Sequence, residues 1–151
     1  DFIGLNYYTH VLTSPFLPQT TEIDLPARKH EIVTEFGYPM YAEGLERAVK
    51  WLEKLNIPIE ITENGVADAN DELRPKHLKR HLWIIAKLIR QGSDIRSYYH
   101  WSLMDNFEWA EGYTMRFGLY RVDYSTQSRT IRKSGQAYQK VIAHHKQQNP
   151  N

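Results

Sequence analysis

The sequence around residue 60 reads Ile57-Pro58-Ile59-Glu60-Ile61-Thr62-Glu63-Asn64-Gly65, a short apolar run with a polar end. Pro58 interrupts the helical pattern before it, because proline has no amide hydrogen and fits poorly inside a helix. The isoleucines then alternate with other residues, which is the period of a strand. We therefore expect a strand that ends in a hydroxyl, a carboxylate and an amide side chain.

Two further apolar runs, Phe2–Tyr8 and Ile95–Trp101, are predicted as strands of the same kind. Each of the three runs is followed along the chain by helical spacing, at about 42–55, at 75–91 and from about 134. Strands that alternate with helices imply parallel strands joined by right-handed crossovers. The sequence therefore predicts an α/β fold.

The three helices are each expected to bury one apolar stripe. Ser134 is a good N-cap for the last helix, and the polar residues from His144 onward are expected to fray. A connection that contains Pro15, Pro18 and Pro26 precedes the first helix. The expected stripes are Leu45, Ala48, Val49, Leu52 and Leu55 in the first helix, Leu78, Leu82, Ile85, Leu88 and Ile89 in the second, and Ala137, Tyr138, Val141 and Ile142 in the last.

The composition of the 151 residues excludes several classes of function. The chain has no cysteine, which removes disulfides, thiolate metal sites and thiol nucleophiles. Nineteen Lys and Arg balance 18 Asp and Glu, for a formal charge of +1, so nothing favours a nucleic acid as partner. No apolar run approaches the ~20 residues of a membrane span, and no linker divides the chain, so we expect one domain and no membrane partner.

Polar and aromatic residues stand where each predicted strand ends, at Asn6-Tyr7-Tyr8, at Thr62-Glu63-Asn64-Gly65 and at His100-Trp101. The carboxyl ends of parallel strands face the ligand crevice in such folds. Aromatic faces beside amide and carboxylate groups suit a sugar ring, which stacks through its C–H bonds and hydrogen-bonds through its hydroxyls. Position alone leaves a plainer alternative for Glu63, as a helix N-cap or a surface ion pair.

Five ordered motifs give the sequence a specific resemblance. They are Asn6-Tyr7-Tyr8, Gly37-Tyr38-Pro39-Met40-Tyr41-Ala42-Glu43-Gly44-Leu45, Ile61-Thr62-Glu63-Asn64-Gly65, Trp101-Ser102-Leu103-Met104-Asp105-Asn106-Phe107-Glu108-Trp109 and Arg116-Phe117-Gly118-Leu119. Together they resemble glycoside hydrolase family 1, the family of β-glucosidases, β-galactosidases and broad β-glycosidases, from Asp1 to about Ile142. The resemblance implies part of a (β/α)8 TIM barrel, strands six to eight with their helices, so residues 1–151 would be the C-terminal portion of one barrel domain.

The resemblance also implies a reaction, the hydrolysis of unphosphorylated β-glycosides with retention through a covalent glycosyl-enzyme. Glu63 matches the catalytic nucleophile of the family, Tyr8 the tyrosine that orients it, and Asn6 a residue that supports the site near the sugar 2-hydroxyl. The residues implied to bind substrate are Trp101 under the glycone, Glu108 and Trp109 at its hydroxyls, Phe117 at the far wall, and Tyr38 on the leaving-group side. Most relatives carry Trp at the position of Tyr38 and Pro at that of Ala42, so the aglycone preference cannot be carried over.

Glu108 further selects among relatives, because those that cleave 6-phosphorylated sugars have a small residue there. A carboxylate would repel a phosphate, whereas it accepts hydrogen bonds well from a free hydroxyl. The preferred glycone, the aglycone and the compartment stay open in the sequence, with the cytoplasm favoured.

The acid/base of the family lies in a Thr-Xaa-Asn-Glu-Pro segment, and the 151 residues contain no such segment. Since retention needs two carboxyl groups about 5–5.5 Å apart, the chain alone is expected to be a poor glycosidase. We expect its partners to be a β-glycoside or oligosaccharide substrate, and the missing N-terminal half of the barrel or another copy of the chain. A catalytically incompetent fragment or a sugar-binding module that keeps the aromatic platform is the alternative.

No cofactor and no metal are expected. His77 and His81, four residues apart on one helix, could suggest zinc, but without a third ligand a solvated helix face is the preferred interpretation. Lys76, Lys79 and Arg80 are likewise interpreted as the exposed side of that helix.

Overall fold

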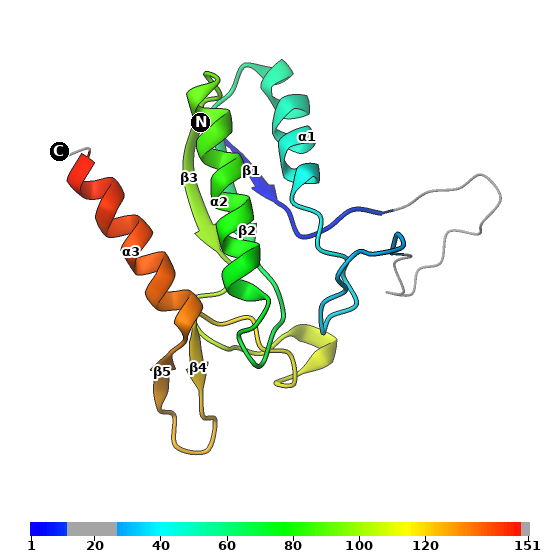
Figure 1. The fold of residues 1–151 in the computed structure, drawn as a ribbon, viewed down its shortest axis with the longest axis vertical. Coiled ribbons are helices and arrows are strands. Elements are labelled where there is room, and N and C mark those ends of the chain that lie inside the picture. The colour runs from blue at the N-terminus through cyan, green and yellow to red at the C-terminus, as the bar shows by residue number, and fades with distance from the viewer. Residues whose placement is uncertain (12–26, 149–151) are drawn as a thin grey trace.

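The computed structural model describes residues 1–11 and 27–148, and Pro15, Pro18 and Pro26 of the predicted connection lie outside the described residues. Figure 1 shows the arrangement of the elements. In chain order they are β1 (Ile3–Asn6), α1 (Glu43–Leu52) with a 3-10 turn (Glu53–Leu55), β2 (Ile59–Asn64), α2 (Arg74–Arg90), β3 (Ile95–His100), a second 3-10 turn (Trp109–Glu111), β4 (Tyr120–Val122), β5 (Arg129–Ile131) and α3 (Lys133–Gln148).

The three predicted strands form one parallel sheet in the order β1-β2-β3, which confirms the predicted α/β arrangement. α1 and α2 cover one face of this sheet (Figure 1). Leu45 and Val49 of α1 and Leu88 of α2 are completely buried against Ile59 and Ile61 of β2. Because the three strands are parallel, their carboxyl ends lie at the same edge of the sheet.

The predicted apolar stripes are only partly correct. Leu55, in the 3-10 turn after α1, and Ile89 are about half exposed, although Leu88 beside Ile89 is completely buried in the core. α3 differs more, since Val141 and Ile142 are 48% and 40% exposed, and Ala137 is exposed as well. Figure 1 gives the reason, because the second half of α3 projects away from the sheet. Of the tail that was expected to fray, residues 144–148 continue the helix, and residues 149–151 lie outside the described residues.

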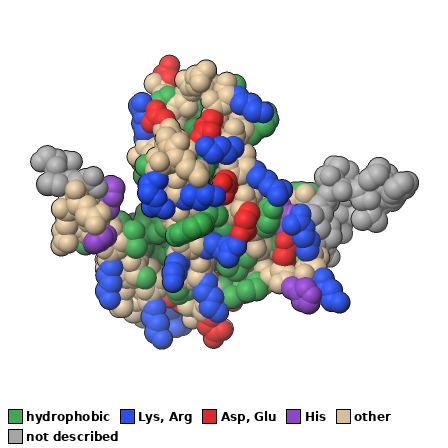
Figure 2. Space-filling model, turned by 45° about the horizontal axis from the view of Figure 1, so that its top comes forward, with side chains coloured by type: hydrophobic (Ala, Val, Ile, Leu, Met, Phe, Trp, Pro, Cys, Tyr) green, Lys and Arg blue, Asp and Glu red, His purple; other side chains and the backbone are tan. Residues whose placement is uncertain are grey.

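His77 and His81 are not on a solvated helix face, so that interpretation was wrong. Each is 1% exposed, and their rings stack with centroids 3.9 Å apart. They point inward because α2 turns them toward the end of β1. The ring centroids of His81 and of Tyr7, the residue after β1, are 6.1 Å apart. Lys76, Lys79 and Arg80 are exposed as predicted, and Figure 2 shows lysine and arginine side chains spread over much of the face drawn there.

β4 and β5 form an antiparallel hairpin that the sequence pattern did not predict. β4 lies in the segment between β3 and α3, and it is joined to Met104 by an isolated bridge. The hairpin therefore supports the loop that follows β3.

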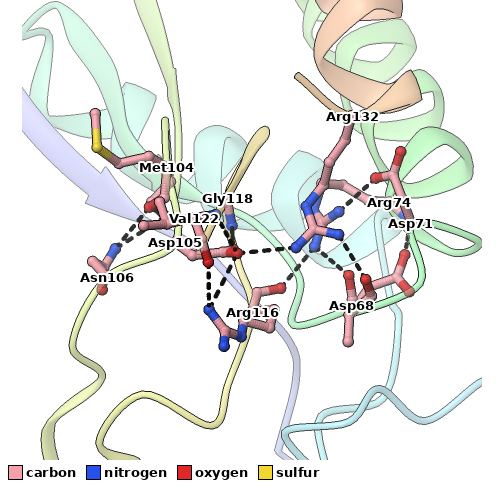
Figure 3. A network of polar contacts seen from close by, with 12 residues as sticks. Asp68, Asp71, Arg74, Met104, Asp105, Asn106, Arg116, Gly118, Val122 and Arg132 are labelled. Carbon is pink, nitrogen blue, oxygen red and sulfur yellow. Dashed lines mark hydrogen bonds and ion pairs between the residues drawn. The ribbon is translucent and has the colours of Figure 1, made fainter. Parts of the chain in front are cut away.

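A network of buried charges joins the loops behind the strand ends (Figure 3). Arg74, at the start of α2, is completely buried, pairs with Asp71, and donates to the carbonyl oxygens of Asp68 (2.6 Å) and Arg116 (2.7 Å). The Asp71 carboxylate also accepts the Ser134 amide hydrogen at 2.8 Å, at the start of α3. The β2–α2 loop is thus joined to both the segment before β4 and the last helix.

Asp105 is the second centre of the same network. It is 3% exposed and accepts hydrogen bonds from the amides of Gly118 (2.9 Å) and Val122 (3.2 Å). Arg132 neutralises it at 3.0 Å and reaches the carbonyl oxygen of Ala69 as well. Buried charges are stable only when paired and hydrogen-bonded, so this network fixes the path of the chain between β3 and β4.

No helix within the described part of the chain is both long and apolar enough to cross a membrane.

Candidate active site

A pocket of about 250 Å³ lies at the carboxyl ends of the three parallel strands. Its lining consists of Tyr8, Phe36, Tyr38, Glu63, Trp101, Glu108, Trp109 and Phe117. The structure therefore brings together every predicted site residue except Asn6. A larger hollow of about 400 Å³ lies at the opposite end of the sheet, beside Lys50, Glu53 and Ser93, and contains none of the predicted residues.

Glu63 and Tyr8 leave adjacent strands and meet in the pocket. The Tyr8 hydroxyl donates a hydrogen bond to Glu63 Oε2 at 2.7 Å. The backbone at the same level is paired, since the Tyr7 amide donates to the Glu63 carbonyl oxygen at 2.9 Å. Burial, and then the hydrogen bond to Glu63, raise the pKa of the Tyr8 phenol above its ordinary value. The phenol therefore stays protonated and remains a donor near neutral pH.

Trp101 and Glu108 form the second polar contact of the pocket. The Trp101 indole donates from Nε1 to Glu108 Oε2 at 3.3 Å. The peptide bond between Trp101 and Ser102 is cis. The nearby position 65 must be glycine, because a Cβ atom there would overlap the carbonyl oxygen of Trp101. Trp109 is 84% exposed in this structure, so its indole offers a free aromatic face at the rim.

An aromatic wall closes the other side of the pocket. Phe117 is 4% exposed and meets Tyr8 edge to face at 6.4 Å. Tyr38 and Phe117 both contact the ring of Phe36, at 4.8 Å and 5.7 Å. Burial and then the charge of Glu108 raise the pKa of Tyr38, so its hydroxyl also stays protonated.

Phe36 is the lining residue that the sequence reading missed. Phe36 lies in a turn between Val33 and Pro39, which form an isolated bridge, and Gly37 after it has a φ of 79°. The turn, and not a strand period, brings the Phe36 ring beside Tyr38, so no periodicity in the sequence indicated it.

Asn6 is not part of the pocket lining. It is the last residue of β1, and its amide oxygen accepts a hydrogen bond from the Thr62 hydroxyl at 2.6 Å. The structure thus places Asn6 beside the neighbouring strand, two residues before Tyr8.

Within residues 1–11 and 27–148, no group of three or more histidine, aspartate or glutamate side chains is arranged to hold a metal ion. What the pocket offers is one carboxylate held by a phenol, a second carboxylate held by an indole, and aromatic faces around both.

The sequence profile of glycosyl hydrolase family 1 matches residues 1–147. The chain belongs to this family. Among its similar relatives are the β-glucosidase of Agrobacterium sp. (42% identical, over 91% of this chain and 33% of that protein) and the β-galactosidase of Saccharolobus solfataricus (35% identical, over 93% of this chain and 31% of that protein).

Solved structures of family 1 enzymes superpose on the chain. The crystal structure of the hyperthermophilic β-glucosidase from Pyrococcus furiosus matches with a TM-score of 0.86 and 38% identity, over 95% of this chain and 33% of that one. The family 1 β-glucosidase of Thermotoga maritima matches with a TM-score of 0.82 and 37% identity, over 95% of this chain and 34% of that one. The chain spans about a third of the length of these relatives, and its three parallel strands form part of the (β/α)8 barrel, as the sequence predicted.

Proposed function

We propose that the chain supplies the nucleophile and much of the glycone site of a retaining β-glycosidase that hydrolyses unphosphorylated β-glycosides. The observation that carries the proposal is the 2.7 Å hydrogen bond between Tyr8 and Glu63 inside a pocket walled by aromatic rings. Membership of glycosyl hydrolase family 1 supports the same reaction class.

Glu63 is the nucleophile in this proposal. One of its carboxylate oxygens attacks the anomeric carbon, and the bond from that carbon to the leaving-group oxygen breaks, which leaves a covalent glycosyl-enzyme. Water then attacks the anomeric carbon and frees Glu63. Tyr8 acts by holding the carboxylate, since Oε2 accepts its hydrogen bond and a single rotamer of Glu63 is favoured.

The leaving group needs a proton, and a second carboxyl group about 5–5.5 Å from the nucleophile supplies it in retaining enzymes. Glu108 is the other carboxylate of the pocket, but it is engaged with the Trp101 indole and fits a sugar-binding role better. The proposal therefore places the acid/base in the part of the barrel that this chain does not span.

The glycone lies against Trp101 in this account, with Glu108 and Trp109 at its hydroxyls and Phe117 closing the wall. Indole faces stack on the C–H bonds of a sugar, and a carboxylate can accept two hydroxyl hydrogens at once. The same carboxylate disfavours a phosphate at this position, because two negative charges repel strongly in a partly buried pocket. Tyr38 and Phe36 lie together on the other side, where they would face the leaving group.

We further propose that residues 1–151 are the C-terminal portion of one barrel domain and that the rest of the barrel is the partner of this chain. Among the described residues β1 and β3 each have one neighbour in the three-stranded sheet, so each leaves one edge unpaired there. Phe2 beside β1 and Tyr99 on β3 are 54% and 56% exposed. An open strand edge beside exposed apolar side chains favours association, with the remaining strands or with a second copy.

The experiment compares the wild type and Glu63→Gln in the full-length barrel that contains this chain, with an aryl β-glucoside as substrate. The account expects turnover by the wild type and a loss of at least about 10³-fold in Glu63→Gln, because the amide is a very weak nucleophile. Sugar binding without turnover in either form would favour the alternative, a binding module that keeps the aromatic platform.

A further inference from the structure

Asn64, the residue after Glu63, joins the ends of all three parallel strands. It is completely buried, and its Nδ2 donates to the Tyr7 carbonyl oxygen at 2.7 Å. Its Oδ1 accepts from the Tyr98 hydroxyl of β3 at 3.0 Å, and its own carbonyl oxygen accepts the Trp101 amide hydrogen at 3.0 Å. The Asn64 side chain thus connects Tyr7, the residue before Tyr8, to Tyr98 of β3.

The chemistry of the partners fixes the orientation of this amide. A backbone carbonyl oxygen can only accept a hydrogen bond, so Nδ2 must face Tyr7 and Oδ1 is left for the Tyr98 hydroxyl. Both contacts lie in the interior, where an unpaired polar atom is costly. The amide is therefore held by one contact on each side.

The side-chain contacts occur where the register of the strands shifts. The β1–β2 register shifts between Leu5 and Asn6, and the β2–β3 register shifts between Ile61 and Asn64. Beyond the first shift the Tyr7 amide still donates to the Glu63 carbonyl oxygen at 2.9 Å, so backbone pairing resumes after an irregular step. The Asn64 amide adds cross-strand bonds at this level, next to the two residues that meet in the pocket.

We propose that Asn64 is a positioning residue, whose amide sets the separation between the Tyr8 hydroxyl and the Glu63 carboxylate. The inference rests on the proposed role of Glu63 as nucleophile. Tyr7 and Tyr8 are consecutive, as are Glu63 and Asn64, so a shift of the Tyr7–Asn64 contact moves the Tyr8–Glu63 contact with it. Tyr98 acts one step further away, by orienting the amide.

Asn64→Asp tests the donor in the full-length barrel, because aspartate keeps the shape of asparagine but presents no N–H to the Tyr7 carbonyl. Asn70→Asp is the matched control, since it makes the same change at an exposed position of the following loop. Tyr98→Phe is the second variant, which removes only the hydroxyl and leaves the ring in place. The readouts are the rate at which a 2-fluoro-glycoside labels Glu63 and the Kd of a reversible sugar inhibitor.

Asn64→Asp should slow labelling about 100-fold, the size of effect that a displacement of about 1 Å produces at a reacting centre, while the inhibitor Kd changes less than about 3-fold. Tyr98→Phe should slow it about 5-fold because the donor contact persists, and Asn70→Asp should label like the wild type. In a Tyr8→Phe background the Asn64→Asp change should cost far less, because both act on one contact.

Equal losses in both backgrounds, or a labelling rate and inhibitor affinity that fall together with thermal stability, would show a purely structural role and overturn the proposal. If the wild type does not label at all, the proposal that Glu63 is the nucleophile has failed. The positioning role of Asn64 is then tested separately by crystal structures of the wild type and Asn64→Asp. A Tyr8–Glu63 distance that lengthens from 2.7 Å beyond about 3.5 Å in Asn64→Asp supports the positioning role, and an unchanged distance rejects it.

Discussion

The Tyr8 hydroxyl lies 2.7 Å from Glu63 Oε2, although 55 residues separate the two along the chain. Parallel pairing of β1 with β2 produces this contact, because it brings the end of each strand to the same level. A phenol that keeps its proton can orient a carboxylate through a hydrogen bond and leave it negatively charged. This arrangement suits a nucleophile.

Tyr8→Phe removes this hydrogen bond and keeps the ring that packs against Phe117. Since a hydrogen bond to a charged group contributes about 1.5–3 kcal/mol, kcat/KM should fall about 10- to 100-fold with little loss of stability. Steady-state kinetics of the full-length barrel measure this change, with Tyr113→Phe, at an exposed position outside the pocket lining, as control. Wild-type kinetics in Tyr8→Phe would contradict the assigned role.

Glu108 should select free over 6-phosphorylated glycosides. In Glu108→Ala the loss of a charged hydrogen-bond acceptor should lower kcat/KM for a free glucoside about 10- to 100-fold, while any turnover of the phosphorylated substrate should fall less or rise. The neighbouring Glu111→Ala serves as control. A wild type that prefers the phosphorylated glycoside would refute the assignment of substrate class.

Arg74→Ala should destabilise the fold strongly, because it leaves the Asp71 carboxylate buried without its cation and frees the carbonyl oxygens of Asp68 and Arg116. Breaking a buried pair costs about 3–5 kcal/mol. Urea unfolding measures the difference in free energy of unfolding, with Arg90→Ala at the exposed end of α2 as control. Equal stability of the two variants would mean that the network in Figure 3 does not hold the loops.

The buried histidines should make the protein sensitive to acid. Burial lowers the pKa of His81 to about 4 and that of His100 to about 3, and burial together with the charge of His81 lowers the pKa of His77 well below its ordinary value. The unfolded chain binds protons near pH 6.5, so the stability contributed by the neutral rings is complete above about pH 6.5 and is lost as the pH falls toward 4.

The contribution of His81 alone is on the order of 3 kcal/mol. Urea unfolding at pH 7 and pH 4.5 should therefore show a smaller pH dependence in His81→Leu than in the wild type, whereas His30→Leu, at an exposed histidine, should keep the wild-type dependence. If the free energy of unfolding changed equally between pH 7 and pH 4.5 in all three proteins, His81 would be protonated in the folded state, against this prediction.

The sheet and the strand-end residues of the pocket could be predicted from local patterns, whereas Tyr38, Glu108, Trp109 and Phe117 were expected only through the resemblance to a known family. Alternation of isoleucines marks β2, and parallel strands bring Tyr8, Glu63 and Trp101 to one edge. Asn6 lies beside the neighbouring strand and not in the pocket lining, and its supporting role stays a prediction.

Other features depend on partners that a local pattern does not contain. Val141 has the helical spacing of a core residue, but the half of α3 that carries it projects from the sheet. His77 looks like a surface residue by type, but the rotation of α2 places it inside. Arg74 takes two of its acceptors from Asp68 and Asp71 just before the helix, but its third, the Arg116 carbonyl oxygen, lies 42 residues further along the chain. No spacing within α2 indicates that third partner.

The central claim is that Glu63 is the nucleophile, and covalent trapping tests it most directly. The full-length barrel that contains this chain is incubated with a 2-fluoro-β-glucoside bearing a good leaving group, digested, and analysed by mass spectrometry. The account predicts one fluoroglycosyl group per protein, bound to the peptide that contains Glu63, and no label in Glu63→Gln. A label on any other residue, or turnover that persists in Glu63→Gln, would contradict it.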